Sequence, residues 1–174
     1  MSTAATPPAE LPVQARTFDP AQLAPSDCYK LLAGSVVPRP IAFVSSHDAQ
    51  GVLNLAPFSF FTVASANPPV VCFSAAVREP KNGLAATKDT LANIEATGEF
   101  VVNIVSEELV DAMNQTAAQV PPEVDEFALA GLTPLASEVV RVPRVAEAKV
   151  QMECRLTEVV RVSSLPLGLS LIHI

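Results

Sequence analysis

Positive charge gathers in one short segment of an otherwise acidic chain. Arg78, Lys81 and Lys88 fall within eleven residues, whereas no lysine or arginine occurs between Asp89 and Val140. Lys88 directly precedes a predicted helix, and the free N–H groups and the dipole of a helix N-terminus also favour an anion. The spacing therefore predicts a phosphate-binding site around these cations. Ordinary solvated loop charges would give the same pattern, so that alternative stays open.

A second segment combines aromatic rings with polar groups. Residues 54–62 read NLAPFSFFT, and they contain three of the chain's nine aromatic residues beside an amide and two hydroxyl groups. Flat ligands with polar edges bind to surfaces of this kind. The alternative is a strand that packs two of the rings into the core, and the residues alone do not choose between the two.

Other chemistries find little support in the residue types present. His47 and His173 form no plausible metal site with the cysteines and no nucleophile–base pair. Cys28, Cys72 and Cys154 are widely spaced, and we interpret them as reduced, mostly buried small hydrophobic residues. The 18 acidic residues are interpreted as solvated faces. No catalytic acid, base or nucleophile and no metal site is predicted.

Composition narrows the class of protein. With 174 residues, 49% of them hydrophobic and only 17% charged, the chain is expected to fold as one globular domain. The net charge of −7, without a basic stripe, argues against nucleic-acid binding. No apolar run reaches the roughly 18 residues that a membrane-spanning helix needs, and the first residues do not resemble a signal peptide. We therefore expect a cytoplasmic protein that does not bind membranes.

The hydrophobic pattern predicts mainly strands, with a few short helices. Strands are expected over residues 35–46, 52–63, 70–77, 99–105 and 149–157, and the last of these alternates between apolar and polar residues. Helices are expected from an N-cap at Asp89 to Gly98, from Ser106 to about Gln119, and near residues 125–130. The first three strands have the spacing of an antiparallel meander. Strands and helices do not alternate regularly, which favours a small barrel or sandwich over a Rossmann sheet.

Five ordered motifs resemble the flavin reductase-like family of FMN-binding split barrels, which includes flavoredoxin-like proteins. They read VPRPIA at 37–42, NLAPFSFF at 54–61, NPP at 67–69, KDTLANI at 88–94 and GEFVVN at 98–103. Later stretches are also similar, namely VDEF at 124–127, AGLTP at 130–134 and ECRL at 153–156. The resemblance spans about residues 27–160.

This resemblance implies a mainly β fold with flanking helices, a split β-barrel, over residues 26–174. Residues 1–25 are rich in Ala and Pro and have few large apolar side chains, so we expect them to form a flexible arm. The resemblance also implies non-covalent FMN and a homodimer with flavin at the interface. Carried onto this sequence, Arg39, Pro40, Asn54, Ser59 and Phe60 would lie along the flavin and its ribityl chain. Lys88, Asp89, Thr90 and Asn93 would surround the phosphate, with Ser74 and Arg78 as further candidates.

The function implied is an FMN-dependent oxidoreductase. It would transfer hydride from NADH or NADPH to the flavin and pass electrons to free flavin, a monooxygenase partner or another acceptor. Two alternatives stay open. One is a flavoredoxin-type electron carrier without its own NAD(P)H activity, and the other is a barrel that binds a small ligand other than flavin.

The C-terminal residues differ from the family pattern. Family members usually continue past a segment like residues 165–168 into a further strand and a tail. We therefore expect residues 167–174 to be an apolar strand that lacks its next partner in a truncated barrel. Unpaired edges of that kind promote self-association, and this chain would then be inactive or aggregate.

Overall fold

The computed structural model describes residues 16–78, 86–162 and the backbone of 169–173, and its two compact units are Met1–Ser35 and Val36–Ile174. The first unit contains the 3-10 helix η1 (Pro20–Gln22), capped by the Asp19 carboxylate, and helix α1 (Pro25–Ser35). No residue of α1 is buried. The proposed division into an arm over residues 1–25 and a domain over 26–174 stays a prediction.

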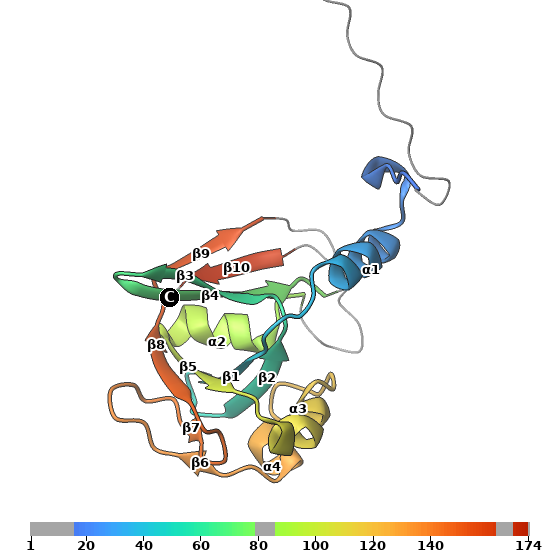
Figure 1. The fold of residues 1–174 in the computed structure, drawn as a ribbon. Helices are drawn as coiled ribbons and strands as arrows, with labels where there is room; N and C mark the ends of the chain where they lie inside the picture. Colours follow the sequence, from blue (N-terminus) through green and yellow to red (C-terminus); the bar gives the residue numbers. More distant parts are fainter. Residues whose placement is uncertain (1–15, 79–85, 163–168, 174) are drawn as a thin grey trace, which may run out of the picture. The chain divides into compact units, whose positions relative to one another are not determined.

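The second unit contains two four-stranded antiparallel sheets (Figure 1). In the β1 sheet the order is β2 (Leu53–Phe58), β1 (Ala42–His47), β5 (Glu99–Ile104) and β8 (Gln151–Arg155). In the β4 sheet the order is β3 (Phe61–Ala66), β4 (Pro69–Ala76), β10 (Leu169–His173) and β9 (Glu158–Arg161). A two-stranded ribbon joins β6 (Pro134–Leu135) to β7 (Arg144–Val145). This mainly β architecture with flanking helices confirms the predicted fold class.

Helix α2 (Asp89–Thr97) lies between the two sheets and supplies the centre of the core (Figure 1). Its Leu91 and Ile94 are buried against Phe58, Phe73 and Phe100 from three strands. The ring centroids of Phe58 and Phe73 are 4.8 Å apart, and those of Phe73 and Phe100 are 5.8 Å apart in an edge arrangement. The aromatic cluster therefore fixes α2 against strands of both sheets.

The other face of the β1 sheet is covered by η2 (Glu107–Leu109), α3 (Val110–Thr116) and α4 (Glu126–Ala130). Phe43 packs there with Leu109, Met113 and Phe127, while its neighbours Ala42 and Val44 point into the α2 core. Successive strand residues point to opposite faces, so β1 is buried on both sides. This double burial explains why even Ser45 and Ser46 of β1 are fully buried.

The second predicted strand, residues 52–63, is in fact two strands in different sheets. Phe58 and Phe61 both pack into the α2 core, yet residues three apart in one straight strand point to opposite faces. The chain therefore bends at Ser59 and Phe60 and crosses from the β1 sheet to the β4 sheet. The antiparallel pairings that the meander predicts are confirmed, β1 with β2 and β3 with β4, but they belong to two different sheets.

The expected unpartnered strand at the C-terminal end of the sequence is also wrong. Strand β10 pairs with β4 on one side and with β9 on the other, so the edges of this sheet are β3 and β9. Its partner β4 lies far earlier in the chain, and local sequence patterns carry no information about such a pairing. The predicted strand 149–157 is confirmed as β8, except that Val150 lies before the strand and is 52% exposed.

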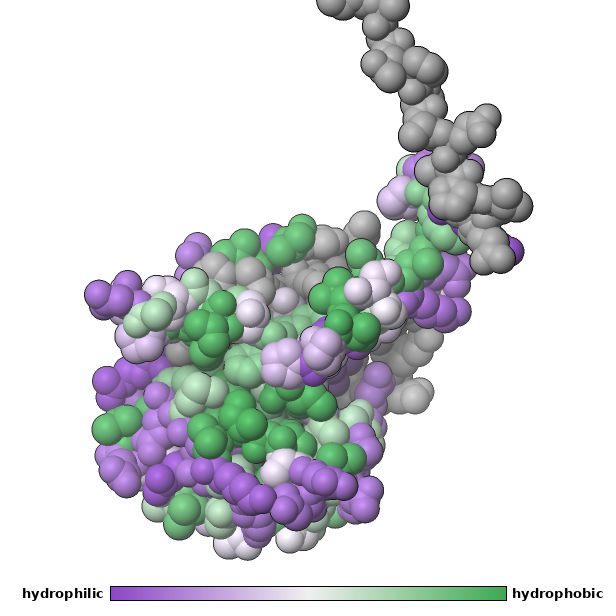
Figure 2. Space-filling model, in the orientation of Figure 1, coloured by the Kyte–Doolittle hydropathy of each residue, from purple (hydrophilic) through white to green (hydrophobic). Residues whose placement is uncertain are grey.

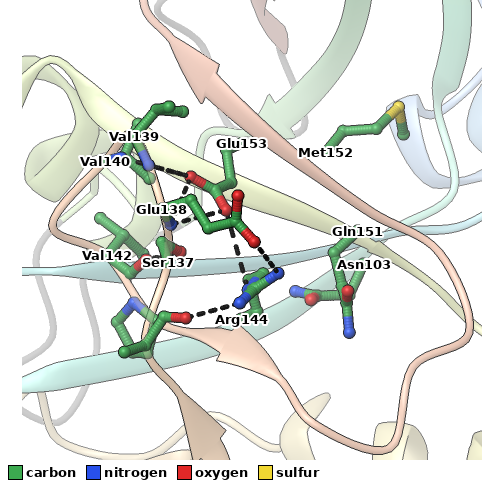
Figure 3. A network of polar contacts seen from close by, with 12 residues as sticks. Asn103, Ser137, Glu138, Val139, Val140, Val142, Arg144, Gln151, Met152 and Glu153 are labelled. Carbon is green, nitrogen blue, oxygen red and sulfur yellow. Dashed lines mark hydrogen bonds and ion pairs between the residues drawn. The ribbon is translucent and has the colours of Figure 1, made fainter.

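A polar network holds the 137–145 segment against β8 (Figure 3). The Glu153 carboxylate accepts hydrogen bonds from the backbone N–H groups of Glu138 and Val139 at 2.9 and 2.6 Å. Arg144 Nε lies 3.7 Å from the same carboxylate. Backbone N–H donors stabilise the ionised form, and they lower the pKa of Glu153. The network is a structural tether for the loop.

Two further observations concern the described residues only. No helix among them has both the length and the apolar character needed to cross a bilayer. No group of three or more His, Cys, Asp and Glu side chains among them could hold a metal ion. Cys72 and Cys154 are free and buried, as predicted, whereas Cys28 is half-buried.

Candidate anion-binding site

A small cavity of about 120 Å³ opens where four parts of the second unit meet. Its wall is formed by β2, by Arg78 two residues after β4, by the N-terminus of α2 and by the end of α3 with α4. The lining residues are Asn54, Ala56, Pro57, Arg78, Lys88, Asp89, Thr90, Thr116, Ala117, Ala118, Gln119, Val120 and Glu126.

Two cations and a helix N-terminus face this cavity. Lys88 is the N-cap residue of α2 and provides no side-chain cap, so the first-turn N–H groups receive no acceptor from it. Arg78 donates to both carboxylate oxygens of Asp89, at 3.1 and 3.2 Å, and to the Thr87 carbonyl. Asp89 is the first helical residue and not the N-cap, and its carboxylate pairs with Arg78. This arrangement suits an anion at the start of α2.

Lys88 is held in a partly apolar environment. Its Nζ lies 5.3 Å from the centroid of the Phe58 ring. Burial lowers the pKa of Lys88, the nearby Arg78 charge lowers it further, and Asp89 opposes both effects. Asp89 therefore balances the positive charge of Lys88 only in part, and a bound anion would balance the rest.

A chain of buried polar side chains runs behind the cavity. Asn54 Nδ2 donates to both Glu126 oxygens at 3.0 and 3.1 Å, and Asn54 Oδ1 accepts from Thr90 Oγ1 at 2.7 Å. Asn54 Oδ1 also accepts from Ser46 Oγ at 3.2 Å, and Ser46 Oγ accepts from Asn93 Nδ2 at 3.2 Å. These five residues connect β1, β2, α2 and α4. Their network fixes the first turn of α2 relative to the sheet.

Glu126 is the residue of this site that the sequence interpretation missed. The residue is only 6% exposed, although the sequence predicts that the acidic residues are solvated. Burial raises the pKa of Glu126 to about 7, against the opposing hydrogen bonds from the Leu55 backbone N–H and from Asn54. The one feature that could have indicated its burial is its position between the helix cap Asp125 and the core residue Phe127.

The structure brings about half of the predicted site residues together. Asn54, Arg78, Lys88, Asp89 and Thr90 line the cavity. Asn93 is buried beside Ser46 and contributes to the polar chain behind it. The remaining candidates do not line this cavity; they are Arg39, Pro40, Ser59, Phe60 and Ser74.

Three of those remaining candidates form a second group. The Arg39 guanidinium lies 5.6 Å from the centroid of the Phe60 ring and donates to the Val36 carbonyl at 2.8 Å. The Phe60 carbonyl accepts from the Ser74 backbone N–H at 2.8 Å. Arg39 and Phe60 are each half-buried, so a cation and an aromatic ring are available side by side at the surface.

Curated relatives cover most of this chain. A protein of Aquifex aeolicus (strain VF5), described as an uncharacterized protein, is 50% identical over 134 residues. That alignment covers 77% of this chain and 66% of the relative. The chain thus spans about two thirds of the length of such relatives.

Solved structures show the same fold. Nitrilotriacetate monooxygenase component B from Bacillus cereus superposes with a TM-score of 0.84 at 42% identity, covering 91% of this chain and 77% of that one. The 2-nitrobenzoate 2-nitroreductase of Pseudomonas fluorescens superposes with a TM-score of 0.79 at 29% identity, covering 91% and 72%. The flavin reductase like domain matches residues 33–168. With this match over most of its length, and with a split-barrel fold, the chain belongs to the flavin reductase-like family.

Proposed function

We propose that the chain is the flavin-binding part of an FMN-dependent oxidoreductase that oxidises NADH or NADPH and passes the electrons to an acceptor. The observation that carries this proposal is the cavity with Lys88 and Arg78 at the uncapped N-terminus of α2, in a chain of the flavin reductase-like family. Bound flavin would supply the redox chemistry. The protein's part is to bind, orient and shield it.

The cavity fits a phosphate better than a whole ligand. Its volume of about 120 Å³ is well below the roughly 300 Å³ at which pockets begin to enclose a small molecule. Its donors are cations and helix N–H groups, the set that phosphate prefers. We therefore assign the FMN phosphate to Lys88, Arg78 and Thr90, with Asp89 orienting Arg78 and Asn93 acting from behind through Ser46.

The flavin ring and ribityl chain would then extend out of the cavity over the bend between β2 and β3. Asn54, Ser59 and Phe60 come from this segment, and the Arg39–Pro40 segment and Ser74 lie on the strands and loops beside it. The Arg39–Phe60 pair would offer a planar cation and a ring to one edge of the flavin. These six positions remain candidates for binding, with no acid–base role.

Two partners follow from the same proposal. The Bacillus cereus relative is named as component B of a monooxygenase, which supports a monooxygenase partner for the reduced flavin. Figure 2 shows apolar residues gathered over the middle of one face of the second unit, where Figure 1 places α2 between the sheets. Contiguous apolar surface marks interaction sites. We propose that a second copy covers it in a homodimer, which light scattering after gel filtration would detect.

The proposal is tested by flavin retention and by turnover. The purified full chain is incubated with FMN, passed through gel filtration and examined for flavin absorption, and NADH and NADPH oxidation is then followed with and without FMN. A yellow protein that oxidises either nucleotide only with FMN supports the proposal. A yellow protein that is reduced only by a protein donor would identify an electron carrier, and a protein that retains no FMN would contradict flavin binding altogether.

A further inference from the structure

A buried acid lies in the same cavity as the two cations. The Glu126 carboxylate lines it, is 6% exposed, and accepts hydrogen bonds only from neutral donors among the described residues. Those donors are Asn54 Nδ2 and the Leu55 backbone N–H, and no described cation lies within salt-bridge distance of Glu126. An acid without a cationic partner at an anion site needs a physical explanation.

The charges that face the cavity nearly cancel when Glu126 is ionised. Arg78, after β4, and Lys88, at the start of α2, are positive, and Asp89 is negative. The β2 and α3 parts of the wall add only neutral groups, such as Asn54 and Thr116. With Glu126 ionised the described lining residues sum to zero, and with Glu126 protonated they sum to +1. The protonation state of this one group therefore decides whether the cavity attracts an anion.

We propose that binding of an anionic group in this cavity is coupled to the uptake of one proton by the Glu126 carboxylate. An O–H bond forms at Glu126 as a hydronium ion or buffer acid in the solvent gives up its proton and its own bond to that proton breaks, and no covalent bond of the bound anion changes. The inference rests on the proposed function in one respect, since it takes the physiological anion to be the FMN phosphate. Anion affinity then falls as the pH rises.

The hydrogen bonds around Glu126 leave one oxygen suited to the proton. Oε2 accepts from the Leu55 N–H and from Asn54 Nδ2, both at 3.1 Å, whereas Oε1 accepts from Asn54 Nδ2 alone at 3.0 Å. Protonation at Oε1 keeps both donors satisfied by Oε2. Burial already raises the pKa of Glu126 to about 7, with a smaller contribution from Asp89, so the proton is exchanged near neutral pH. A nearby anion would raise this pKa further.

The test compares anion affinity at two pH values in wild-type protein and in Glu126→Gln, which mimics the protonated acid. FMN binding to the full chain is measured at about pH 7 and pH 8.5, where the phosphate, with a second pKa of about 6, is mostly dianionic. With a free-state pKa of about 7 for Glu126 and about one pKa unit of coupling, we expect wild-type affinity to fall about fourfold over this interval, and the variant to change less than about twofold. Glu123→Gln, the same charge change at an exposed position, should behave like the wild type.

A second probe separates this inference from the proposed function. Inorganic sulfate does not titrate in this range, and its binding is followed by NMR through the backbone amides of residues 88–91. A pH-dependent sulfate affinity that Glu126→Gln removes supports the coupling even if FMN does not bind, in which case only the proposed function falls.

Three results would overturn the coupling. The first is a pH dependence that persists unchanged in Glu126→Gln, which would assign it to Lys88. The second is an affinity that is independent of pH in the wild type. The third is the absence of binding by both probes, which would remove the anion site itself and the proposed function with it.

Discussion

Lys88 carries the charge on which the proposed phosphate site depends most directly. It is the N-cap residue of α2, it lines the cavity, and its pKa is lowered because burial disfavours the ammonium form. Among the described lining residues Arg78 is already engaged by Asp89, so Lys88 supplies the less compensated cation. The burial that lowers its pKa also strengthens its attraction for a bound anion.

Lys88→Ala should therefore weaken FMN binding about ten- to a hundredfold, because a charge-assisted hydrogen bond is worth roughly 1.5–3 kcal/mol. The free energy of unfolding should change little. Fluorescence titration with FMN gives the dissociation constant. Lys149→Ala is the matched control, since Lys149 pairs with Glu108 at an exposed position outside the cavity. Equal FMN affinity in Lys88→Ala and wild type would place the phosphate elsewhere.

Asn54 is the central residue of the buried polar chain. Its amide nitrogen donates to Glu126 and its amide oxygen accepts from Thr90 and Ser46, and all four residues are buried. Asn54→Ala would remove the acceptor of the Thr90 and Ser46 hydroxyl groups and one of the two donors to Glu126, at a cost of about 2–4 kcal/mol in the free energy of unfolding. Urea denaturation measures the loss. Asn114→Ala, on the exposed side of α3, is the control. An equal loss in both variants would show that the buried polar network around Asn54 contributes nothing to stability.

At the scale of elements, the ends of α2 determine how the helix sits between the sheets. Its C-terminus is confirmed at Gly98, which has φ 72° and whose N–H donates to the Ile94 carbonyl. Its N-terminus begins at Asp89, one residue away from the predicted start, because Asp89 pairs with Arg78 and does not cap the helix. This shift by one residue is what places Lys88 at the cap and in the cavity.

Gly98→Ala should destabilise the protein by about 1–2 kcal/mol, since a left-handed backbone is unfavourable for any residue with a Cβ. No atom lies within 4 Å of a Cβ built at Gly98, so the effect comes from the backbone conformation and not from a clash. Thermal denaturation measures the change. Gly34→Ala, inside α1, has equal space around it and no positive φ, and its stability should be unchanged or higher. An unchanged thermal stability of Gly98→Ala would contradict the role of Gly98 as the C-cap of α2.

At the scale of the whole molecule, buried and tethered carboxylates give stability an optimum in pH. Glu99 and Glu153 have lowered pKa values, chiefly because backbone N–H groups of Arg141 and Glu138 donate to them. Their contribution is present above the ordinary pKa of 4.5 and is lost as the pH falls below it. Glu126 acts in the opposite direction. Its pKa is raised to about 7, so its contribution is present below 4.5 and is lost as the pH rises through 7.

The free energy of unfolding should therefore fall between about pH 5 and pH 8, by about 3 kcal/mol at most from Glu126. Urea denaturation at a series of pH values, without flavin, measures the slope. In Glu126→Gln the slope over this interval should be smaller than in wild type, while the loss of stability below pH 4.5 should remain. An identical slope in both proteins would mean that Glu126 does not titrate in the folded state.

Exposed apolar surface is also a property of the whole molecule, and it bears on self-association. The expected cause of self-association, an unpaired last strand, is absent, because β10 lies between β4 and β9. The apolar face seen in Figure 2 is what the homodimer proposal rests on instead. The physical driving force is burial of side chains and not the pairing of a free strand edge.

By itself, the sequence determined the class of fold, most of the elements and the charge at the site. Helix boundaries such as Gly98 and the Asp125 cap follow from local backbone preferences, and the alternation in β8 follows from an edge strand with one apolar and one polar face. The position of Lys88 beside a helix N-terminus could be predicted because it depends only on the start of the helix that follows it. Each of these properties depends on residues close together in the chain.

Only the tertiary structure decided which segments meet. The crossing between sheets at Ser59 and Phe60 depends on Phe58 and Phe61 sharing one core, and the place of β10 depends on pairing with the distant β4. Glu126 became a site residue because α4 packs against β2, which excludes water from a carboxylate that the sequence shows as one acid among many. Burial, long-range pairing and the pKa shifts they cause depend on contacts between residues far apart in the chain, and for that reason the sequence pattern could not supply them.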